Sequence, residues 1–126
     1  MKAIVARVFA PLAALEHSDW PEPEATGSNV VIAAEAIGVN YPDALLVQGL
    51  YQVKPPTPFV PGMEVAGRVV AVGPRATRFA IGDRVGAVTM IGSYAERVGV
   101  AESDAFRLPD SLPADEACAL MCAYGT

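Results

Sequence analysis

The chain offers few side chains that could bind a metal or act as a nucleophile. His17 is the only histidine among the 126 residues, and the only cysteines are Cys118 and Cys122. A catalytic zinc takes three protein ligands from Cys, His and acidic side chains. The four-residue spacing of the cysteines places both on one face of a helix, where free thiols behave as small apolar groups. A disulfide has poor geometry at this spacing, so we expect reduced thiols in a reducing compartment.

Glycine loops that bind phosphate are the next candidates, and none is complete. No Gly-x-Gly-x-x-Gly segment follows a predicted strand. Gly62 and Gly67 are spaced like the ends of a phosphate loop, but no Lys-Ser or Lys-Thr pair follows them. We interpret them as a turn and a close strand contact. This chain alone should therefore bind a dinucleotide weakly or not at all.

Composition and charge exclude other classes of function. A hydrophobic share of 52% and a charged share of 18% describe a folded domain and not a disordered chain. Nine Lys and Arg residues are scattered against fourteen Asp and Glu residues, giving a formal net charge of -5. Nucleic-acid binding needs clustered positive charge that neutralises phosphates. We therefore predict no nucleic-acid partner.

The N-terminal segment is apolar-rich and needs a separate test. Residues 4–15 loosely resemble a signal peptide, but Arg7 interrupts them and residues 16–19 form no cleavage site. A first β-strand is the better interpretation, and no segment reaches the length of a membrane span. The sequence predicts a cytoplasmic protein without a membrane partner.

The elements that must position these residues are short. Eleven glycines and eleven prolines divide the chain, which favours brief strands over long helices. We predict a helix over 41–48, with Asn40 as its cap, Pro42 at its first position and Asp43 at its positive end. The predicted strands are Lys2–Phe9, Val30–Val39, Glu64–Val72, Arg84–Val88, Tyr94–Val100 and Ala105–Leu108. This spacing predicts an all-β barrel or sandwich with small helical insertions. We expect His17 to lie in a turn, exposed to solvent.

The final segment is different in character. A predicted helix opens at Pro113 with acidic residues in its first turn and continues through Cys122. The chain stops at Thr126, directly after this apolar helix. Natural domains usually end in polar, exposed residues. We therefore expect a continuation of the chain, or a partner surface, beyond the helix.

Five ordered segments resemble the medium-chain dehydrogenase/reductase superfamily over nearly the whole chain. They are Gly38-Val39-Asn40-Tyr41-Pro42-Asp43, Gln48-Gly49-Leu50-Tyr51, Pro61-Gly62-Met63-Glu64-Val65-Ala66-Gly67, Gly82-Asp83-Arg84-Val85 and Gly92-Ser93-Tyr94-Ala95-Glu96. The resemblance implies a mainly β fold, a GroES-like partly open barrel with short helices that spans residues 1–126. It also implies that the C-terminal helix leads toward a Rossmann domain that is absent from this chain. In that family the active site lies in the cleft between the two domains.

The resemblance raises the question of zinc. In the zinc branch a cysteine stands at the position of Asn40 and a histidine at the position of Met63. An amide and a thioether are poor zinc ligands. Glu64 is shared with the zinc branch and Cys122 falls near a third ligand position, but two ligands are too few for a catalytic zinc site. The cysteine-rich segment that binds structural zinc is missing too, so we expect no zinc.

A reductase without a metal polarises its substrate oxygen with hydrogen-bond donors. Tyr51 matches the active-site tyrosine of the 2-enoyl thioester reductase branch, and a phenol stays protonated at neutral pH. The resemblance therefore implies that Tyr51 is the proton donor. The alternative is a tyrosine that packs a turn with its hydroxyl in water.

The remaining site residues also come from the resemblance. Asn40 matches the asparagine beside the nicotinamide ribose in the quinone reductase branch, and its amide both donates and accepts; a helix cap alone is the alternative. Thr126 matches the threonine near the nicotinamide in that branch. Tyr41, Asp43 and Met63 are expected to border the substrate pocket, although Asp43 also fits a first-turn helix charge.

Taken as a family member, the chain is expected to be the N-terminal, substrate-side domain of a zinc-free reductase. That reductase would transfer hydride from NADPH to a quinone or an α,β-unsaturated carbonyl, either an enone or an enoyl thioester. The preference for NADPH and a homo-oligomeric full-length protein are implied by the family alone. An alternative of another class is a standalone GroES-like binding or oligomerisation module without catalysis. A third is a zinc alcohol dehydrogenase with displaced ligands.

Overall fold

The computed structural model describes residues 1–124, with side chains described as far as Met121. In chain order the elements are β1 (Lys2–Val5), η1 (Leu12–Ala14), β2 (Glu16–Asp19), β3 (Asn29–Ile37), α1 (Tyr41–Val47), β4 (Glu64–Val72), β5 (Arg84–Val88), β6 (Arg97–Ala101), η2 (Glu102–Asp104), β7 (Ala105–Arg107) and α2 (Ala114–Tyr124). The strands form a two-stranded ribbon, β1-β2, and a five-stranded sheet in the order β6-β3-β4-β5-β7. Every pair within them is antiparallel.

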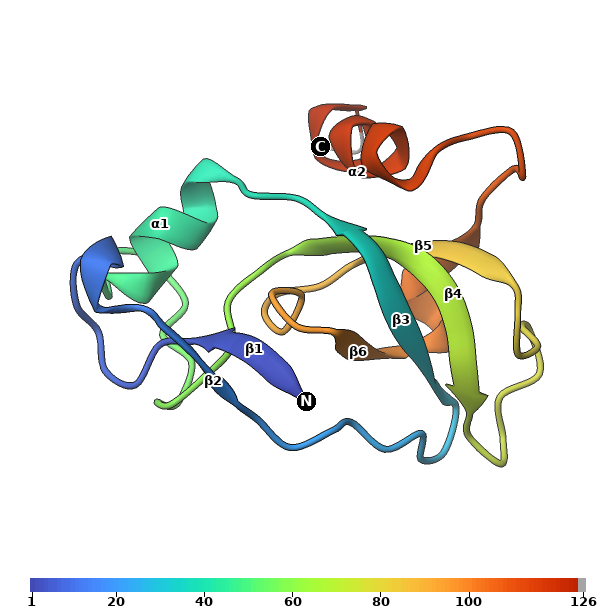
Figure 1. Cartoon of the computed structure of the whole chain (residues 1–126), viewed down its shortest axis with the longest axis horizontal. Coiled ribbons are helices and arrows are strands. Elements are labelled where there is room, and N and C mark those ends of the chain that lie inside the picture. The colour runs from blue at the N-terminus through green and yellow to red at the C-terminus, as the bar shows by residue number, and fades with distance from the viewer. Residues whose placement is uncertain (125–126) are drawn as a thin grey trace.

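The two edges of the five-stranded sheet are joined by a very short connection. β6 and β7 are the edge strands, yet only the three residues of η2 separate them in sequence. A chain spans at most about 3.6 Å per residue, so η2 can join these edges only if the sheet curls. Figure 1 shows the result, a curved sheet in which β3, β4 and β5 arch over β6. The described strands form a partly open barrel.

Side chains from all five strands of this sheet meet inside the barrel. β6 shows the two-residue alternation of a half-buried strand, because it buries Val98 and Val100 and exposes Arg97 and Gly99. The buried cluster comprises Val30, Ile32, Val65, Val69, Phe79, Val85, Ala87, Val98, Val100 and Ala105. Each fully buried aliphatic side chain contributes roughly 1.5–3 kcal/mol. This core fixes the strands whose ends carry the site.

The two helices lie outside the barrel: α2 lies across the sheet, and α1 lies to one side of it, beside the β1-β2 ribbon (Figure 1). α1 buries Leu46 and Val47 in a small cluster with Ala6 and Phe59. α2 packs across β3 and β4 and buries Ala117, Cys118 and Met121 in a separate cluster with Ala66 and Leu108.

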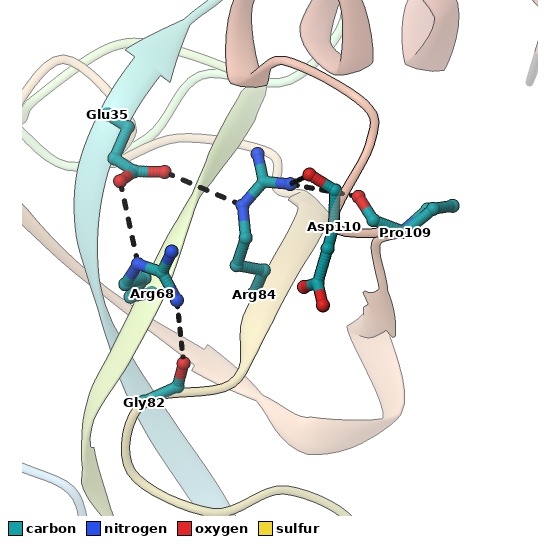
Figure 2. Close-up of polar contacts among 6 residues, drawn as sticks. All are labelled: Glu35, Arg68, Gly82, Arg84, Pro109 and Asp110. Carbon is teal, nitrogen blue, oxygen red and sulfur yellow. Dashed lines mark hydrogen bonds and ion pairs between the residues drawn. The ribbon is translucent and has the colours of Figure 1, made fainter.

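A nearly buried arginine ties the segment before α2 to the sheet. Arg84 of β5 keeps only 10% of its side chain exposed. Its Nη1 donates to the carbonyl of Pro109 at 2.9 Å and to that of Asp110 at 3.3 Å, while its Nε lies 4.0 Å from a Glu35 carboxylate oxygen. Figure 2 shows Glu35 between Arg84 and Arg68, whose Nε lies 3.8 Å away. A planar guanidinium satisfies several acceptors in fixed directions, so Arg84 sets the path of the chain into α2.

The predicted strands over 64–72 and 84–88 are confirmed to the residue as β4 and β5. The predicted helix over 41–48 is confirmed, although α1 ends at Val47 with Gln48 as its C-cap. The strand predicted over 105–108 ends one residue earlier, at Arg107.

Three predictions that involve the N-terminal ribbon and the segment paired with it are partly wrong. The strand expected over 2–9 ends at Val5, because the main chain of Ala6 changes partner and bonds to Phe59 at 2.8 and 3.0 Å. The strand expected over 94–100 begins at Arg97, because the carbonyl of Tyr94 accepts the N–H of Ile4 at 2.9 Å before the chain joins β3. His17 does not lie in a turn: it is exposed on β2, opposite Ile4.

Candidate functional site

The candidate site begins at the N-terminus of α1. Asn40 has the extended backbone of an N-cap, with φ −125° and ψ 156°, and a proline stands in the first turn after it. The backbone N–H of Asn40 donates to Oδ2 of Asp43 at 3.0 Å. A carboxylate three residues into a helix satisfies one of the free main-chain donors at that end. The prediction of Asn40 as the cap is confirmed.

The side chain of Asn40 points to a residue on another element. Its Nδ2 donates to Oε1 of Glu64, the first residue of β4, at 3.2 Å. Glu64 is only 3% exposed. The main chain makes room for it at Gly38, where a Cβ would lie 1.6 Å from Oε1 of Glu64. A glycine at 38 is therefore required for Glu64 to reach Asn40.

Two buried carboxylates lie around Asn40. Asp43 is only 4% exposed, and its Oδ2 also accepts the hydroxyl proton of Tyr94 at 2.8 Å. Oδ1 of Asp43 and Oε2 of Glu64 are buried and make no hydrogen bond to any described residue. A buried acceptor without a partner costs about 1–3 kcal/mol, and such groups need an explanation. Each of the two oxygens can accept a further donor.

Asn40 and Glu64 lie at a cleft of about 600 Å³. One wall is formed by the end of β3 and the start of α1, and the other by α2. The lining residues are Ile37, Gly38, Val39, Asn40, Tyr41, Pro42, Glu64, Asp115, Cys118 and Ala119. The cleft thus combines an amide, carboxyl groups, a thiol and an exposed aromatic ring.

Two groups at the site keep their protons at neutral pH. Burial, and next the charge of Glu64, raise the pKa of the Cys118 thiol to about 11, and Sγ donates to the carbonyl of Ala36 at 3.4 Å. Burial and the hydrogen bond to Asp43 raise the pKa of Tyr94 well above its usual value. Since the thiolate is the reactive form, Cys118 is a poor nucleophile at neutral pH.

The structure brings only two of the predicted site residues to the cleft. Asn40 and Tyr41, which is 75% exposed, line the cleft. Tyr51 and Met63 are partly buried against the apolar cluster under α1 and are not among the residues that line this cleft. Asp43 is buried and does not line the cleft. Thr126 lies outside the described residues. The roles assigned to these residues remain predictions.

The part of the chain that the structure describes holds neither a metal-binding cluster nor a membrane-spanning helix. Among its described residues, no group of three or more His, Cys, Asp and Glu side chains could hold a metal ion. No described helix has both the length and the hydropathy that crossing a bilayer requires.

One polar residue of the site was missed at the sequence level. The sequence places Tyr94 only in a predicted strand and a family segment, and its bond to Asp43 joins residues 51 positions apart. The one signal in the sequence is its position in the Gly92-Ser93-Tyr94 segment, two residues after Gly92.

Comparison with known proteins places this geometry in a family. The family described as the alcohol dehydrogenase GroES-like domain matches residues 26–110, more than half of the chain. A quinone oxidoreductase-like protein 2 homolog of Nematostella vectensis is 41% identical over 100 residues, which cover 79% of this chain and 27% of that protein. A synaptic vesicle membrane protein VAT-1 homolog of Rattus norvegicus is 40% identical over 105 residues, which cover 82% of this chain and 26% of that protein.

Solved structures agree with the sequence relatives. A probable oxidoreductase from Mycobacterium abscessus superposes with a TM-score of 0.92 at 42% identity, over 98% of this chain and 39% of that one. The quinone oxidoreductase of Thermus thermophilus, whose complex with NADPH is known, superposes with a TM-score of 0.79 at 39% identity, over 94% of this chain and 36% of that one. The chain thus spans about a quarter of the sequence relatives and less than half of the structural ones. The predicted mainly β, GroES-like partly open barrel is confirmed.

Proposed function

The chain belongs to the alcohol dehydrogenase GroES-like domain family, and from that premise we propose that it is the substrate-side domain of an NADPH-dependent oxidoreductase. The acceptor is a quinone or an α,β-unsaturated carbonyl, either an enone or an enoyl thioester, and the reaction needs no zinc. The observation that carries the proposal is the cleft in which the amide of Asn40 meets the buried carboxyl of Glu64. Support comes from similar proteins named quinone oxidoreductases, one of them known with NADPH.

The donors and acceptors of the cleft fit one end of NADPH. The amide of Asn40 lies at the cleft, and Oε2 of Glu64 is buried there with no hydrogen-bond partner among the described residues, so it can accept an N–H or O–H. Carboxamide and ribose hydroxyl groups carry such protons, so these two residues would hold the nicotinamide end, with Thr126 as a further contact. When bound, NADPH supplies the hydride. The phosphates would be held mainly by residues outside this chain, since its sequence contains no phosphate-binding glycine loop.

The donor set at the cleft favours chemistry without zinc. Asn40 offers an amide at the cleft, and Met63, which lies apart from it against the cluster under α1, offers a thioether. Both are poor ligands for zinc. Glu64, Asp115 and Cys118 also line the cleft, and the thiol of Cys118 is held protonated. Zinc binds thiolate, and no three His, Cys, Asp or Glu side chains among the described residues are grouped so that they could hold a metal ion.

The proton donor that we propose is Tyr51. Hydride reaches one carbon of the acceptor, negative charge develops on the acceptor oxygen, and a donor must both stabilise that charge and supply a proton. Tyr51 is partly buried against the apolar cluster under α1, which restricts its ring. Tyr41, Asp43 and Met63 are proposed to shape the substrate pocket, Tyr41 by direct contact from the rim of the cleft.

The test is NADPH oxidation by the protein expressed from the full reading frame. 1,4-Benzoquinone and a crotonyl thioester serve as acceptors at saturating concentration, for wild type and Tyr51→Phe. We expect turnover to fall at least about tenfold in the variant, the lower range of general-acid effects. The matched control is Leu50→Ala, because Leu50 is adjacent in sequence and 68% exposed; its turnover should equal that of the wild type.

The outcomes separate the parts of the proposal. Unchanged turnover in Tyr51→Phe would keep the oxidoreductase and remove Tyr51 from its chemistry. Zinc bound stoichiometrically to the active full-length protein would refute zinc independence. If neither acceptor supports NADPH oxidation and NADPH does not bind, a GroES-like module without catalysis would replace the proposal.

A further inference from the structure

Tyr94 is tied to the cleft through a buried carboxylate. Its hydroxyl donates to Oδ2 of Asp43 at 2.8 Å, and the same oxygen accepts the backbone N–H of Asn40 at 3.0 Å. The side chain of Asn40 then donates to Glu64 at 3.2 Å. A continuous chain of hydrogen bonds therefore runs from Tyr94, through the first turn of α1, to the cleft.

The segment that carries Tyr94 is built to hold the ring in place. The backbone N–H of Tyr94 donates to the carbonyl of Pro61 at 2.9 Å. Its ring lies against the bare face of Gly62, where a Cβ would come within 2.5 Å of Cδ1 of Tyr94. Gly62 also has a φ of +113°, which side chains rarely adopt. Any other residue at 62 would displace the ring.

A second set of hydrogen bonds, made by the side chain of Thr89, fixes the same segment. Oγ1 of Thr89 donates to the carbonyl of Gly62 at 2.9 Å and lies 2.9 Å from Oγ of the fully buried Ser93. Tyr94 is thus anchored in its backbone, in its ring and in its hydroxyl. A tyrosine that only filled space would not need the third anchor, because a phenylalanine fills nearly the same volume.

We propose that Tyr94 is a positioning residue, which through Asp43 fixes the N-terminal turn of α1 and so the direction of the Asn40 amide in the cleft. The consequence for NADPH binding rests on the proposed function above. Without the hydroxyl, the buried Asp43 loses one of its two donors, and its Oδ2 is free to move away from the N–H of Asn40. The bond from Nδ2 of Asn40 to Glu64 then loses its fixed direction, since hydrogen bonds weaken steeply with angle.

The first measurement needs no cofactor. In the full-length protein with ¹⁵N-labelled asparagine, the side-chain amide resonances of Asn40 are assigned by their loss in Asn40→Ala. Tyr94→Phe should move this pair and broaden it. Tyr51→Phe removes a hydroxyl beyond the C-terminal end of α1, so it should leave the pair in place. Asp43→Asn serves as a second variant, because a neutral oxygen accepts less strongly and must move the same pair.

The second measurement is the dissociation constant of NADPH. Asn40→Ala should weaken binding about tenfold, the effect of losing one hydrogen bond. Tyr94→Phe should weaken it about threefold, because the same bond is kept with poorer geometry. The double variant should bind no more weakly than Asn40→Ala alone, because Tyr94 acts only through Asn40. A general structural role would instead multiply the two losses to roughly thirtyfold.

Each result bears on one proposal. An unmoved Asn40 pair in Tyr94→Phe, or losses that multiply, would overturn the positioning role and leave the oxidoreductase standing. If Tyr94→Phe moves the pair but the wild-type protein binds no NADPH, the positioning role would be supported and the proposed cofactor refuted. A moved pair together with non-multiplying losses would support both.

Discussion

The two ends of α1 are held in opposite ways. At its N-terminus, Asn40 and Asp43 make directed hydrogen bonds of 2.8–3.2 Å to Glu64 and Tyr94. Among the described residues, the side chains of the C-terminal half make no hydrogen bond to another element, and one main-chain bond joins the N–H of Ala10 to the carbonyl of Val47 at 3.1 Å. This half is held mainly by burying Leu46 and Val47 against the side chains of Ala6 and Phe59.

This difference assigns the stability of α1 to its apolar end and the direction of the Asn40 amide to its polar end. A helix of seven residues is far too short to persist alone in water, so its stability must come from packing. Apolar burial supplies that stability but is non-directional. The polar end cannot add much, because two of its carboxyl oxygens are buried without a described partner. It can fix the direction of the Asn40 amide, and we expect substitutions at the two ends to fail in different ways.

The largest expected effect on stability comes from the apolar end. Leu46 is 1% exposed, and Leu46→Ala removes the buried side chain and leaves a cavity beside Phe59. We expect the free energy of unfolding to fall by about 3 kcal/mol, the middle of the range for such truncations. Urea unfolding measures this loss. The dissociation constant of NADPH for the folded variant should stay within about twofold of wild type, because the apolar end of α1 does not fix the direction of the Asn40 amide. Twofold corresponds to roughly 0.4 kcal/mol.

Leu50→Ala is the control for this prediction, because Leu50 follows the helix and is largely exposed. It should change the free energy of unfolding by less than about 0.5 kcal/mol. The separation of stability from direction would be wrong if Leu46→Ala left stability intact, or if it weakened NADPH binding as strongly as Asn40→Ala.

Gly38→Ala should lower the free energy of unfolding less than Leu46→Ala does and should weaken NADPH binding more. Gly38→Ala places a Cβ where Oε1 of Glu64 now lies, so the carboxyl must leave its bond to Asn40. Overpacking of this kind costs about 2 kcal/mol. We expect that loss in urea unfolding, together with an NADPH dissociation constant raised at least about tenfold, because one bond of about 1.4 kcal/mol is lost.

The matched control replaces a glycine that touches no polar group of the site. At Gly99, on the edge strand β6, an added Cβ would meet only Cβ of Pro23, at 3.1 Å. Gly99→Ala should therefore change neither the NADPH dissociation constant nor, beyond about 0.5 kcal/mol, the free energy of unfolding. Equal NADPH binding by Gly38→Ala and wild type would show that Glu64 has no part in the site.

Local patterns explain which elements were predictable. β4 and β5 are rich in valine and alanine and are bounded by turn residues, Gly73-Pro74 and Gly82-Asp83, so their bounds follow from the sequence. The cap of α1 follows from Asn40 and Pro42. β2 has no such pattern, because Glu16–Asp19 is polar throughout and becomes a strand only by pairing its main chain with β1. Pairing overrides propensity there.

The site was predictable only in part, for a similar reason. Asn40 and Tyr41 are recognisable in their motif, and the structure places both at the cleft. The contacts from Asn40 to Glu64 and from Asp43 to Tyr94 span 24 and 51 residues. Nothing local encodes such distances. They follow from the pairing of β3 with β4 and from the bonds that hold the Tyr94 segment against Pro61 and Gly62.

The smallest expected effect on stability and binding comes from Cys118 of α2, which reports whether the cleft beside the polar end of α1 is a dry, negatively charged environment. Burial, and next the charge of Glu64, raise the pKa of Cys118 from its ordinary value of 9.0 to about 11. In the Cys122→Ser background, iodoacetamide should therefore alkylate Cys118 at pH 8 roughly a hundredfold more slowly than a free thiol, because the thiolate fraction falls tenfold per pKa unit. Mass spectrometry of the Cys118 peptide follows the reaction. Glu64→Gln should speed it several-fold by removing the second cause.

The same shift has a definite sign for stability. A thiol whose pKa is raised by folding binds its proton more tightly in the folded state, so its contribution is complete below pH 9 and is lost as the pH rises toward about 11. Wild type should thus lose more thermal stability than Cys118→Ala between pH 9 and 11. Tyr94, whose pKa is also raised, acts in the same direction in both proteins and cancels from the difference. Identical losses, together with rapid alkylation at pH 8, would mean that water reaches the thiol beside Glu64. The polar end of α1 would then resemble an ordinary surface turn, and the contrast between its two ends would fail.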